Sequence, residues 1–133
     1  MKNKKIIIAG GSGFIGQEIA KYFEKENEII ILTRKIENER NNRNYYTTLT
    51  QNDLSKIRFV KWDGKTVGDW ANELNNAAIV INLAGKTVNC RYTSKNKKEI
   101  IGSRINATKA IGEAIQHCPK PPLIWINASS ATI

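Results

Sequence analysis

Hydrophobic positions along this chain gather in short runs, many of them β-branched, and polar residues separate the runs. Runs of about four to eight such residues are typical of strands that are buried in a parallel sheet. Five of them predict strands, at residues 4–9, 28–33, 57–62, 78–83 and 123–128.

Segments with helical spacing lie between several of these runs. Apolar residues at i, i+4, i+7 and i+8 from Ile15 predict a helix after the first strand. A short helix is expected at residues 69–75 and a long one at 96–118, where Asn96 and Glu99 resemble a capping box. The expected inner faces are Ile15, Ile19, Tyr22 and Phe23 in the first helix and Ile101, Ile105, Thr108, Ile111 and Ile115 in the long one.

Strands that alternate with helices predict an α/β fold, a doubly wound parallel sheet with right-handed crossovers and the strand order 3-2-1-4-5. Residues 34–56 are rich in Asn and charge and predict a loop. The length of 133 residues fits one domain, and 41% hydrophobic residues suffice for a core.

Cellular context follows from what the chain lacks in its sequence. No apolar run reaches the roughly 18 residues of a membrane span, and the first run is too short for a signal peptide. Cys90 and Cys118 fit no disulfide or metal framework. We therefore expect a cytoplasmic protein with no membrane partner and no metal site.

Net charge raises the question of nucleic acid. The chain has 21 Lys+Arg against 12 Asp+Glu, a formal net charge of +9. The excess is spread along the chain, because residues 1–60 carry 11 basic and 7 acidic side chains and residues 61–133 carry 10 and 5. Nucleic-acid binding is therefore not expected.

A glycine motif follows the first predicted strand directly. It reads Gly10-Gly11-Ser12-Gly13-Phe14-Ile15-Gly16 and opens the first predicted helix. Glycines allow a sharp turn, a close approach of the backbone to a pyrophosphate, and tight packing of the helix on the sheet. The helix N-terminus then offers free N–H groups to the phosphates. An ordinary tight turn is the alternative, but this strand–loop–helix context predicts dinucleotide binding.

The end of the second predicted strand bears on the choice of dinucleotide. An acidic residue there binds the ribose 2′-hydroxyl of NAD, whereas a basic residue accommodates the 2′-phosphate of NADP. The strand ends in Thr33-Arg34-Lys35, and the first acid is Glu37. Arg34 can pair with a phosphate in a bidentate manner. The sequence therefore predicts NADP(H) in preference to NAD(H), with a solvated loop charge as the alternative.

Further motifs lie at the ends of later strands. Asn82-Leu83-Ala84-Gly85 ends the fourth strand, and Ser-Ser-Ala-Thr begins at Ser129 after the fifth. With the glycine loop, these residues resemble the short-chain dehydrogenase/reductase superfamily, extended or atypical branch. Trp62-Asp63, Arg91-Tyr92-Thr93 and Ser103-Arg104 with Thr108 are similar to one subgroup, the NAD-dependent epimerase/dehydratase-like proteins also described as cell-division-inhibitor-like sugar-nucleotide epimerases.

The resemblance implies a Rossmann cofactor site. The implied cofactor contacts are Gly10, Gly11, Ser12, Gly13, Phe14, Ile15 and Gly16 at the pyrophosphate, Thr33, Arg34 and Lys35 at the adenosine ribose phosphate, Trp62 and Asp63 near the adenine, Leu83, Ala84 and Gly85 along the ribose path, and Glu99 and Arg104 on the long helix. Trp62 could equally be a core residue, and Glu99 a charge that faces the helix dipole.

The resemblance also implies a catalytic site, from which this chain departs. Ser130 matches the family's catalytic Ser or Thr, with Ser129 as the alternative. The family's Tyr-x-x-x-Lys pair is absent, because none of the four tyrosines has a Lys four residues later. In the family, that pair lies beyond the position of Ile133. Residues 1–133 are therefore expected to be an incomplete NAD(P)-binding Rossmann domain, inactive by itself and lacking the last strands and the substrate domain.

Two functions remain open at this stage. One is the cofactor-binding part of an epimerase/dehydratase-like oxidoreductase that acts on a small, sugar-nucleotide-like molecule. The other is a non-catalytic NADP-binding sensor or interaction module. An open sheet edge after the fifth strand would also allow the chain to form a homo-oligomer.

Overall fold

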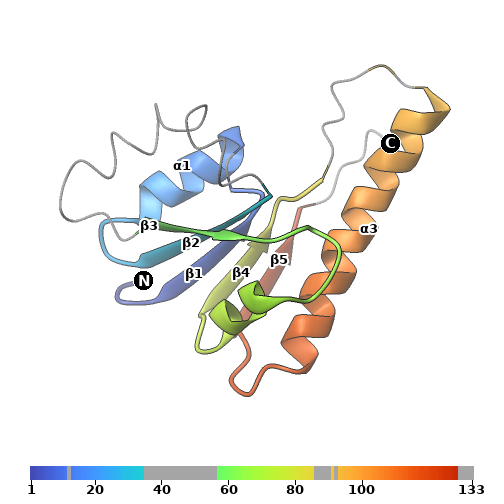
Figure 1. Ribbon diagram of the computed structural model, residues 1–133. Coiled ribbons are helices and arrows are strands. Elements are labelled where there is room, and N and C mark those ends of the chain that lie inside the picture. The colour runs from blue at the N-terminus through green and yellow to red at the C-terminus, as the bar shows by residue number, and fades with distance from the viewer. Residues whose placement is uncertain (12, 35–56, 86–90, 92, 129–133) are drawn as a thin grey trace.

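One parallel sheet organises the molecule. The computed structural model describes residues 1–11, 13–34, 57–85, 91 and 93–128. The strands are β1 (Lys5–Ala9), β2 (Glu28–Thr33), β3 (Ile57–Lys61), β4 (Ile79–Asn82) and β5 (Ile124–Asn127). They run in the order β3-β2-β1-β4-β5, so the predicted fold class and strand order are confirmed (Figure 1). β2 has its predicted bounds, and the other four strands are slightly shorter than predicted.

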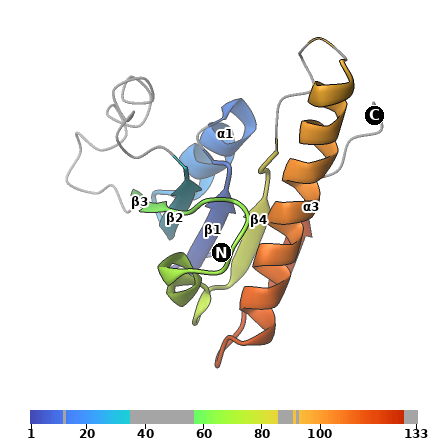
Figure 2. The same cartoon turned by 45° about the vertical axis from the view of Figure 1, so that its right-hand side comes forward.

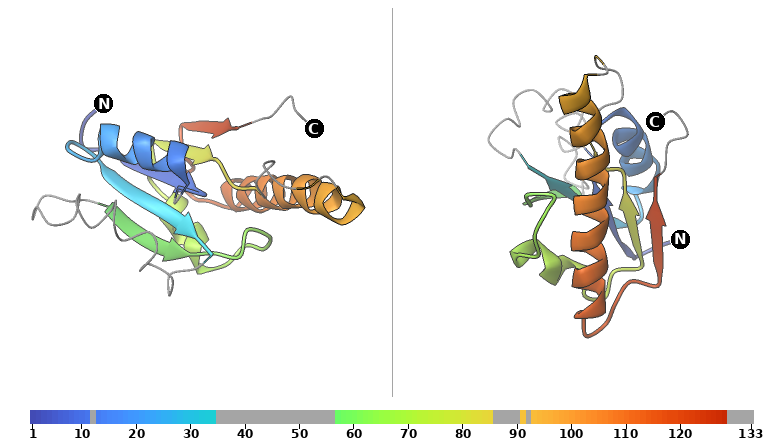
Figure 3. Two further views of the ribbon diagram at one scale, coloured as in Figure 1. Left: turned by 90° about the horizontal axis from the view of Figure 1, so that it is seen from above. Right: turned by 90° about the vertical axis from the view of Figure 1, so that its right-hand side faces the viewer.

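Helices lie on both faces of the sheet (Figure 3). α1 (Phe14–Phe23) packs on one face, and the 3-10 helix η2 (Asp69–Leu74) and α3 (Ser94–Gln116) pack on the other. Successive side chains of a strand point to opposite faces, so the sheet supplies two cores. Ile6, Ile8, Ile29 and Ile31 face α1, whereas Ile7, Ile30, Leu32 and Val80 face η2 and α3.

The inner faces of α1 and α3 are confirmed in part: Ile19 and Phe23 of α1 and Ile111 and Ile115 of α3 face the core as predicted. Ile15 and Tyr22 of α1 are exposed, and Gly16 and Ala20 are buried in their place. In α3, Ile101 and Ile105 are 46% and 47% exposed. The face of α3 that is buried consists of Ile100, Ala107, Ala110, Ile111 and Ala114. Small side chains bring both helices close to the sheet, and a pattern based on large apolar residues misses them.

The start of α3 also corrects a prediction. The helix begins at Ser94, and Thr93 is the N-cap, with its hydroxyl accepting a hydrogen bond from the Asn96 backbone N–H at 3.1 Å. The predicted capping box with Asn96 as the cap is therefore wrong. From Ser94, α3 runs back antiparallel to the strands, so its first turns lie near their carboxyl ends (Figures 1 and 2).

The two edges of the sheet are unequal. β5 is exposed along its whole length, with apolar side chains at Ile124, Trp125 and Ile126. β3, at the other edge, carries the charged side chains of Arg58 and Lys61.

Within the part of the chain that the structure describes, no helix has the length and apolarity needed to cross a bilayer. The same residues contain no group of three acidic, His or Cys side chains placed to hold a metal ion.

Candidate functional site

The glycine motif lies where β1 ends, between the ends of β2 and β4. Gly10 has a φ of +76°, which L side chains rarely adopt, and a Cβ there would lie 2.9 Å from both Cα and N of Ala84. Its backbone N–H donates to the Leu32 carbonyl at 3.1 Å. Gly10 therefore joins the ends of three strands, and a larger residue would push β4 away.

Gly11 and Gly16 serve helix packing. A Cβ on Gly16 would lie 2.4 Å from the Gly11 Cα, and one on Gly11 would lie 2.7 Å from Cδ1 of Ile31. The first turn of α1 thus rests directly on the loop backbone. This is the close contact between helix and strand that the sequence predicts for the motif.

Gly13 has a different environment. It is the N-cap of α1, and among the described residues only the Gly10 carbonyl oxygen would lie within 4 Å of a Cβ there, at 3.7 Å. As a glycine, Gly13 has no side chain with which to cap the helix, and Phe14 and Ile15 are exposed beside it. The space next to Gly13 is open, as a phosphate at the helix N-terminus requires. Ser12 lies outside the described residues.

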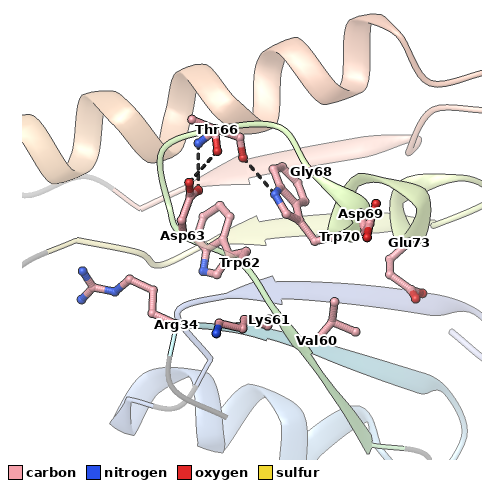
Figure 4. A pocket seen from close by; sticks show the side chains of 10 residues that line it. All are labelled: Arg34, Val60, Lys61, Trp62, Asp63, Thr66, Gly68, Asp69, Trp70 and Glu73. Atoms are coloured by element: carbon pink, nitrogen blue, oxygen red, sulfur yellow. Dashed lines mark hydrogen bonds between the residues drawn. The ribbon is translucent and has the colours of Figure 1, made fainter. Parts of the chain in front are cut away.

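The end of β2 leads into an open cleft of about 770 Å³. Thr33 is buried, and its carbonyl accepts a hydrogen bond from the Trp62 N–H at 3.0 Å. Arg34 follows and lines the cleft together with Trp62 and Asp63, so the structure brings three of the predicted residues together (Figure 4). The cleft is also lined by Val60, Lys61, Thr66, Gly68, Asp69, Trp70 and Glu73. Lys35 lies outside the described residues.

Trp62 forms part of the core as well as part of the cleft. It is 5% exposed and meets Trp70 edge to face, with ring centroids 5.3 Å apart. The Trp70 indole N–H donates to the Thr66 carbonyl at 3.0 Å. Burial supports the interpretation of Trp62 as a core residue, and the same side chain lines the cleft.

Asp63 organises the loop after β3. Its carboxylate accepts a hydrogen bond from the backbone N–H of Lys65 at 2.8 Å. It accepts two more from Thr66, one from the backbone N–H at 2.8 Å and one from the hydroxyl (Figure 4). The hydroxyl and then the backbone donors lower the pKa of Asp63 to about 2. Asp63 is therefore ionised at neutral pH, and its charge already satisfies three donors of its own loop.

The end of β4 meets α3. Gly85 has a φ of +155°, and a Cβ there would lie 3.1 Å from Cγ, Cζ and Nη1 of Arg104. Nη1 of Arg104 also donates to the Ile100 carbonyl at 3.2 Å. The predicted residues Arg104, Ala84 and Gly85 are therefore neighbours at this end of the sheet. Leu83 continues the strand, with its N–H donating to Ala9 at 2.8 Å.

Glu99 does not share this position. It is exposed in the second turn of α3, and the first turn of that helix holds no acidic residue. The alternative interpretation, a charge in the first turn facing the dipole, depends on a helix start at Asn96 and is wrong for a helix that begins at Ser94. Ser129 and Ser130 lie outside the described residues.

A polar group that the sequence reasoning missed joins β4, β5 and α3. The Asn82 amide donates to Oδ1 of Asn127 at 3.1 Å, and the Asn127 amide donates to the Thr108 hydroxyl at 3.3 Å. An Asn at the end of an apolar strand is a usable signal, because a buried amide such as that of Asn82 needs partners. The register pairs Asn82 with Asn127.

The parallel sheet, a loop whose glycines leave no room for a Cβ, and an open helix N-terminus together define a Rossmann-type nucleotide-binding fold. The model of the NAD dependent epimerase/dehydratase family matches residues 6–133, and the chain belongs to this family. Membership of this family implies a dinucleotide cofactor.

Curated relatives support the same family. An epimerase family protein of Staphylococcus saprophyticus is 35% identical over 128 residues, which are 96% of this chain and 38% of the relative. An epimerase family protein of Staphylococcus aureus is 32% identical over 131 residues, with the same two shares. The chain therefore spans 38% of the length of the curated relatives it matches.

Solved structures share the fold at lower identity. A UDP-glucuronic acid 4-epimerase from Bacillus cereus, solved with UDP-glucuronic acid and NAD, has a TM-score of 0.75 at 20% identity. The match covers 97% of this chain and 41% of the epimerase. A short-chain dehydrogenase from Oenococcus oeni has a TM-score of 0.71 at 21% identity, covering 98% of this chain and 63% of its own.

Proposed function

We propose that this chain binds NADP(H), with its pyrophosphate at the glycine loop and its adenosine half in the cleft after β2 and β3. The observation that carries the proposal is the position of Arg34, which lines that cleft directly beyond the buried Thr33. Asp63, an acid in the same cleft, is already engaged by Lys65 and Thr66. Arg34 is thus the group suited to a 2′-phosphate.

The residues present fit the cofactor. Gly10 cannot carry a Cβ, and the open side of Gly13 leaves room for a phosphate beside the first turn of α1. The small residues Ala84 and Gly85 lie beyond the end of β4, on the other side of the loop, with Arg104 next to Gly85. When bound, the nicotinamide supplies or accepts a hydride; the chain's own part is to hold and orient the dinucleotide.

The preference for NADP(H) is tested by titrating the chain with NADPH and NADH and measuring heat or tryptophan fluorescence. We expect NADPH to bind more tightly. Arg34→Ala should weaken NADPH binding about tenfold or more, because it removes a charged partner of the phosphate, and leave NADH binding unchanged. Lys21→Ala is the control, because it removes one positive charge from the exposed surface of α1, outside the cleft. Tighter binding of NADH would contradict the preference.

For the protein as a whole, we propose an epimerase/dehydratase-like oxidoreductase that acts on a small, sugar-nucleotide-like substrate in the cytoplasm, with Ser130 as the catalytic hydroxyl and Ser129 as the alternative. Family membership supports this class, and the Bacillus cereus relative of the same fold was solved with a nucleotide sugar. The second candidate is a non-catalytic NADP-binding sensor or interaction module, which a residue other than Tyr at the family's Tyr-x-x-x-Lys position, beyond Ile133, would favour.

An assay of residues 1–133 with NADP(H) and nucleotide sugars distinguishes binding from turnover. We expect this chain to bind the cofactor without epimerising or reducing a nucleotide sugar, because no tyrosine–lysine pair is present to move the proton. Turnover by these residues alone would contradict that expectation.

A further inference from the structure

Three polar side chains, Asn82, Asn127 and Thr108, form a chain of hydrogen bonds, here called the tie, that joins the ends of β4 and β5 to α3. Asn82 ends β4 and is only 5% exposed. Its amide nitrogen donates to Oδ1 of Asn127 on β5 at 3.1 Å, and the Asn127 amide donates to the hydroxyl of Thr108 on α3 at 3.3 Å. The Asn127 amide therefore accepts from one element and donates to another, which fixes the orientation of its plane.

The other end of this tie reaches the cofactor loop. Oδ1 of Asn82 accepts a hydrogen bond from the Ala84 backbone N–H at 3.0 Å. Ala84 is the residue against which Gly10 packs, with its Cα and N both 2.9 Å from the place a Gly10 Cβ would take. A shift of Asn82 would thus be transmitted to the backbone that borders the glycine loop.

The strand order places this tie under one half of a bound dinucleotide. β1 is central, with β2 and β3 on one side and β4 and β5 on the other. If the pyrophosphate lies at the end of β1 and the adenosine lies beside Arg34 after β2, the remaining half extends over the ends of β4 and β5. The same end of β4 receives a second contact from α3, where Arg104 covers Gly85 one turn before Thr108.

Resting on the proposed function, we propose that Asn82, Asn127 and Thr108 are positioning residues that hold the ends of β4 and β5 in place for the nicotinamide half of NADP(H). The Thr108 hydroxyl accepts a hydrogen bond from the Asn127 amide. Asn127 in turn accepts from the Asn82 amide nitrogen, which keeps Oδ1 of Asn82 facing the Ala84 N–H. None of the three needs to touch the cofactor for this role. The adenosine half binds at the opposite side of the loop and does not depend on the tie.

Thr108→Val tests the proposal, because valine keeps the shape of threonine and removes the hydroxyl. Binding of NADPH and of 2′,5′-ADP, which has the adenosine half and its 2′-phosphate alone, is measured for the parent chain and the variant. We expect about fivefold weaker binding of NADPH and unchanged binding of 2′,5′-ADP, since one hydrogen bond is lost under one half of the ligand only.

Two further variants separate positioning from simple loss of stability. Thr108→Ser keeps the acceptor and should restore NADPH affinity to the parent value. Asn127→Ala removes an exposed side chain and should reproduce the effect of Thr108→Val, and it serves in place of that variant if Thr108→Val does not fold. Equal weakening of both ligands, or weakening of neither, would overturn the inference.

Failure of the proposed function has a different signature. A parent chain that binds neither NADPH nor 2′,5′-ADP overturns cofactor binding itself, and with it the inference. A parent chain that binds both, with a Thr108→Val variant that behaves like the parent, overturns the role of the tie alone.

Discussion

The loop after β3 and the ends of β4 and β5 flank the same glycine loop, yet hydrogen bonds of different range hold them. In the loop after β3, the side chain of Asp63 bonds to Lys65 and Thr66, and that of Trp70 bonds to Thr66, so these side-chain hydrogen bonds stay within four residues. On the other flank, Asn82 bonds to Asn127 across 45 residues, and Asn127 bonds to Thr108 across 19.

This difference has consequences for the two halves of the proposed site. A turn closed by near neighbours can form with little loss of chain entropy, whereas contacts between distant residues exist only once the sheet is assembled. The loop after β3, on the proposed adenosine side, is therefore held largely by local side-chain contacts. The β4–β5 side depends on the packing of α3 against the sheet, and substitutions there should act over a longer distance.

The largest effect is expected from Gly10→Ala, which attacks the contact between the glycine loop and β4. Alanine would have to adopt a φ of +76° with its Cβ 2.9 Å from the Ala84 backbone. We expect the free energy of unfolding to fall by about 2–4 kcal/mol, measured by urea denaturation.

Gly13→Ala is the matched control, since its Cβ would meet nothing closer than 3.7 Å and its φ is −77°. Its stability should stay close to that of the parent, with weaker NADPH binding as the expected change. Equal destabilisation by the two substitutions would show that the β4 contact is not the reason.

A smaller loss is expected from Asn82→Ala, which removes the long-range tie. It leaves the Ala84 N–H and the Asn127 amide without their partner, at a cost of about 1–3 kcal/mol in urea denaturation. A double-mutant cycle with Asn127→Ala should give a coupling energy of about 0.5 kcal/mol or more. Strict additivity of the two substitutions would argue against the tie.

On the local side, the pH dependence of Asp63 sharpens the comparison. Its pKa is lowered from 3.8 to about 2 by the Thr66 hydroxyl and the backbone donors. A lowered pKa means that the ionised carboxylate stabilises the folded turn, so this contribution is complete above about pH 4 and is lost as the pH falls through about 2.

Carboxyl carbon NMR titration measures this pKa directly. Thr66→Val should raise the pKa of Asp63 towards 3.8, because the hydroxyl is its largest cause, and Thr66→Ser should leave it low. Resonances of Asn82 and Asn127 should not respond to either substitution. A midpoint near 3.8 in the parent chain would contradict the turn.

The smallest effect is expected from Glu73→Gln, in the 3-10 helix η2, which follows the loop after β3. Glu73 forms a two-pronged ion pair with Arg58, both distances being 2.8 Å, which lowers the pKa of Glu73 and raises that of Arg58. Because the pair is partly exposed, its loss should cost less than about 1 kcal/mol in thermal unfolding and should diminish with added salt. A larger, salt-independent loss would mean that Glu73 supports the core.

Sequence reasoning succeeded where the determinants lie close together in the chain. The β-branched runs became the five strands, and the glycines of residues 10–16 became the tight loop, because both patterns restrict backbone geometry locally. It succeeded only in part on the faces of α1 and α3, where Ile19, Phe23, Ile111 and Ile115 face the core as predicted. There the small residues Gly16, Ala20 and Ala107 are buried and larger ones such as Tyr22 and Ile105 are exposed.

By itself, then, the sequence determined the strands, their order, the glycine loop and the basic residue after β2, since periodicity, glycine content and the handedness of crossovers suffice for these. Only the tertiary structure decided which face of α3 is buried, that Arg104 lies over Gly85, and that Asn82, Asn127 and Thr108 meet. The physical reason is range: these contacts join residues that are neighbours only after the helix has packed on the completed sheet.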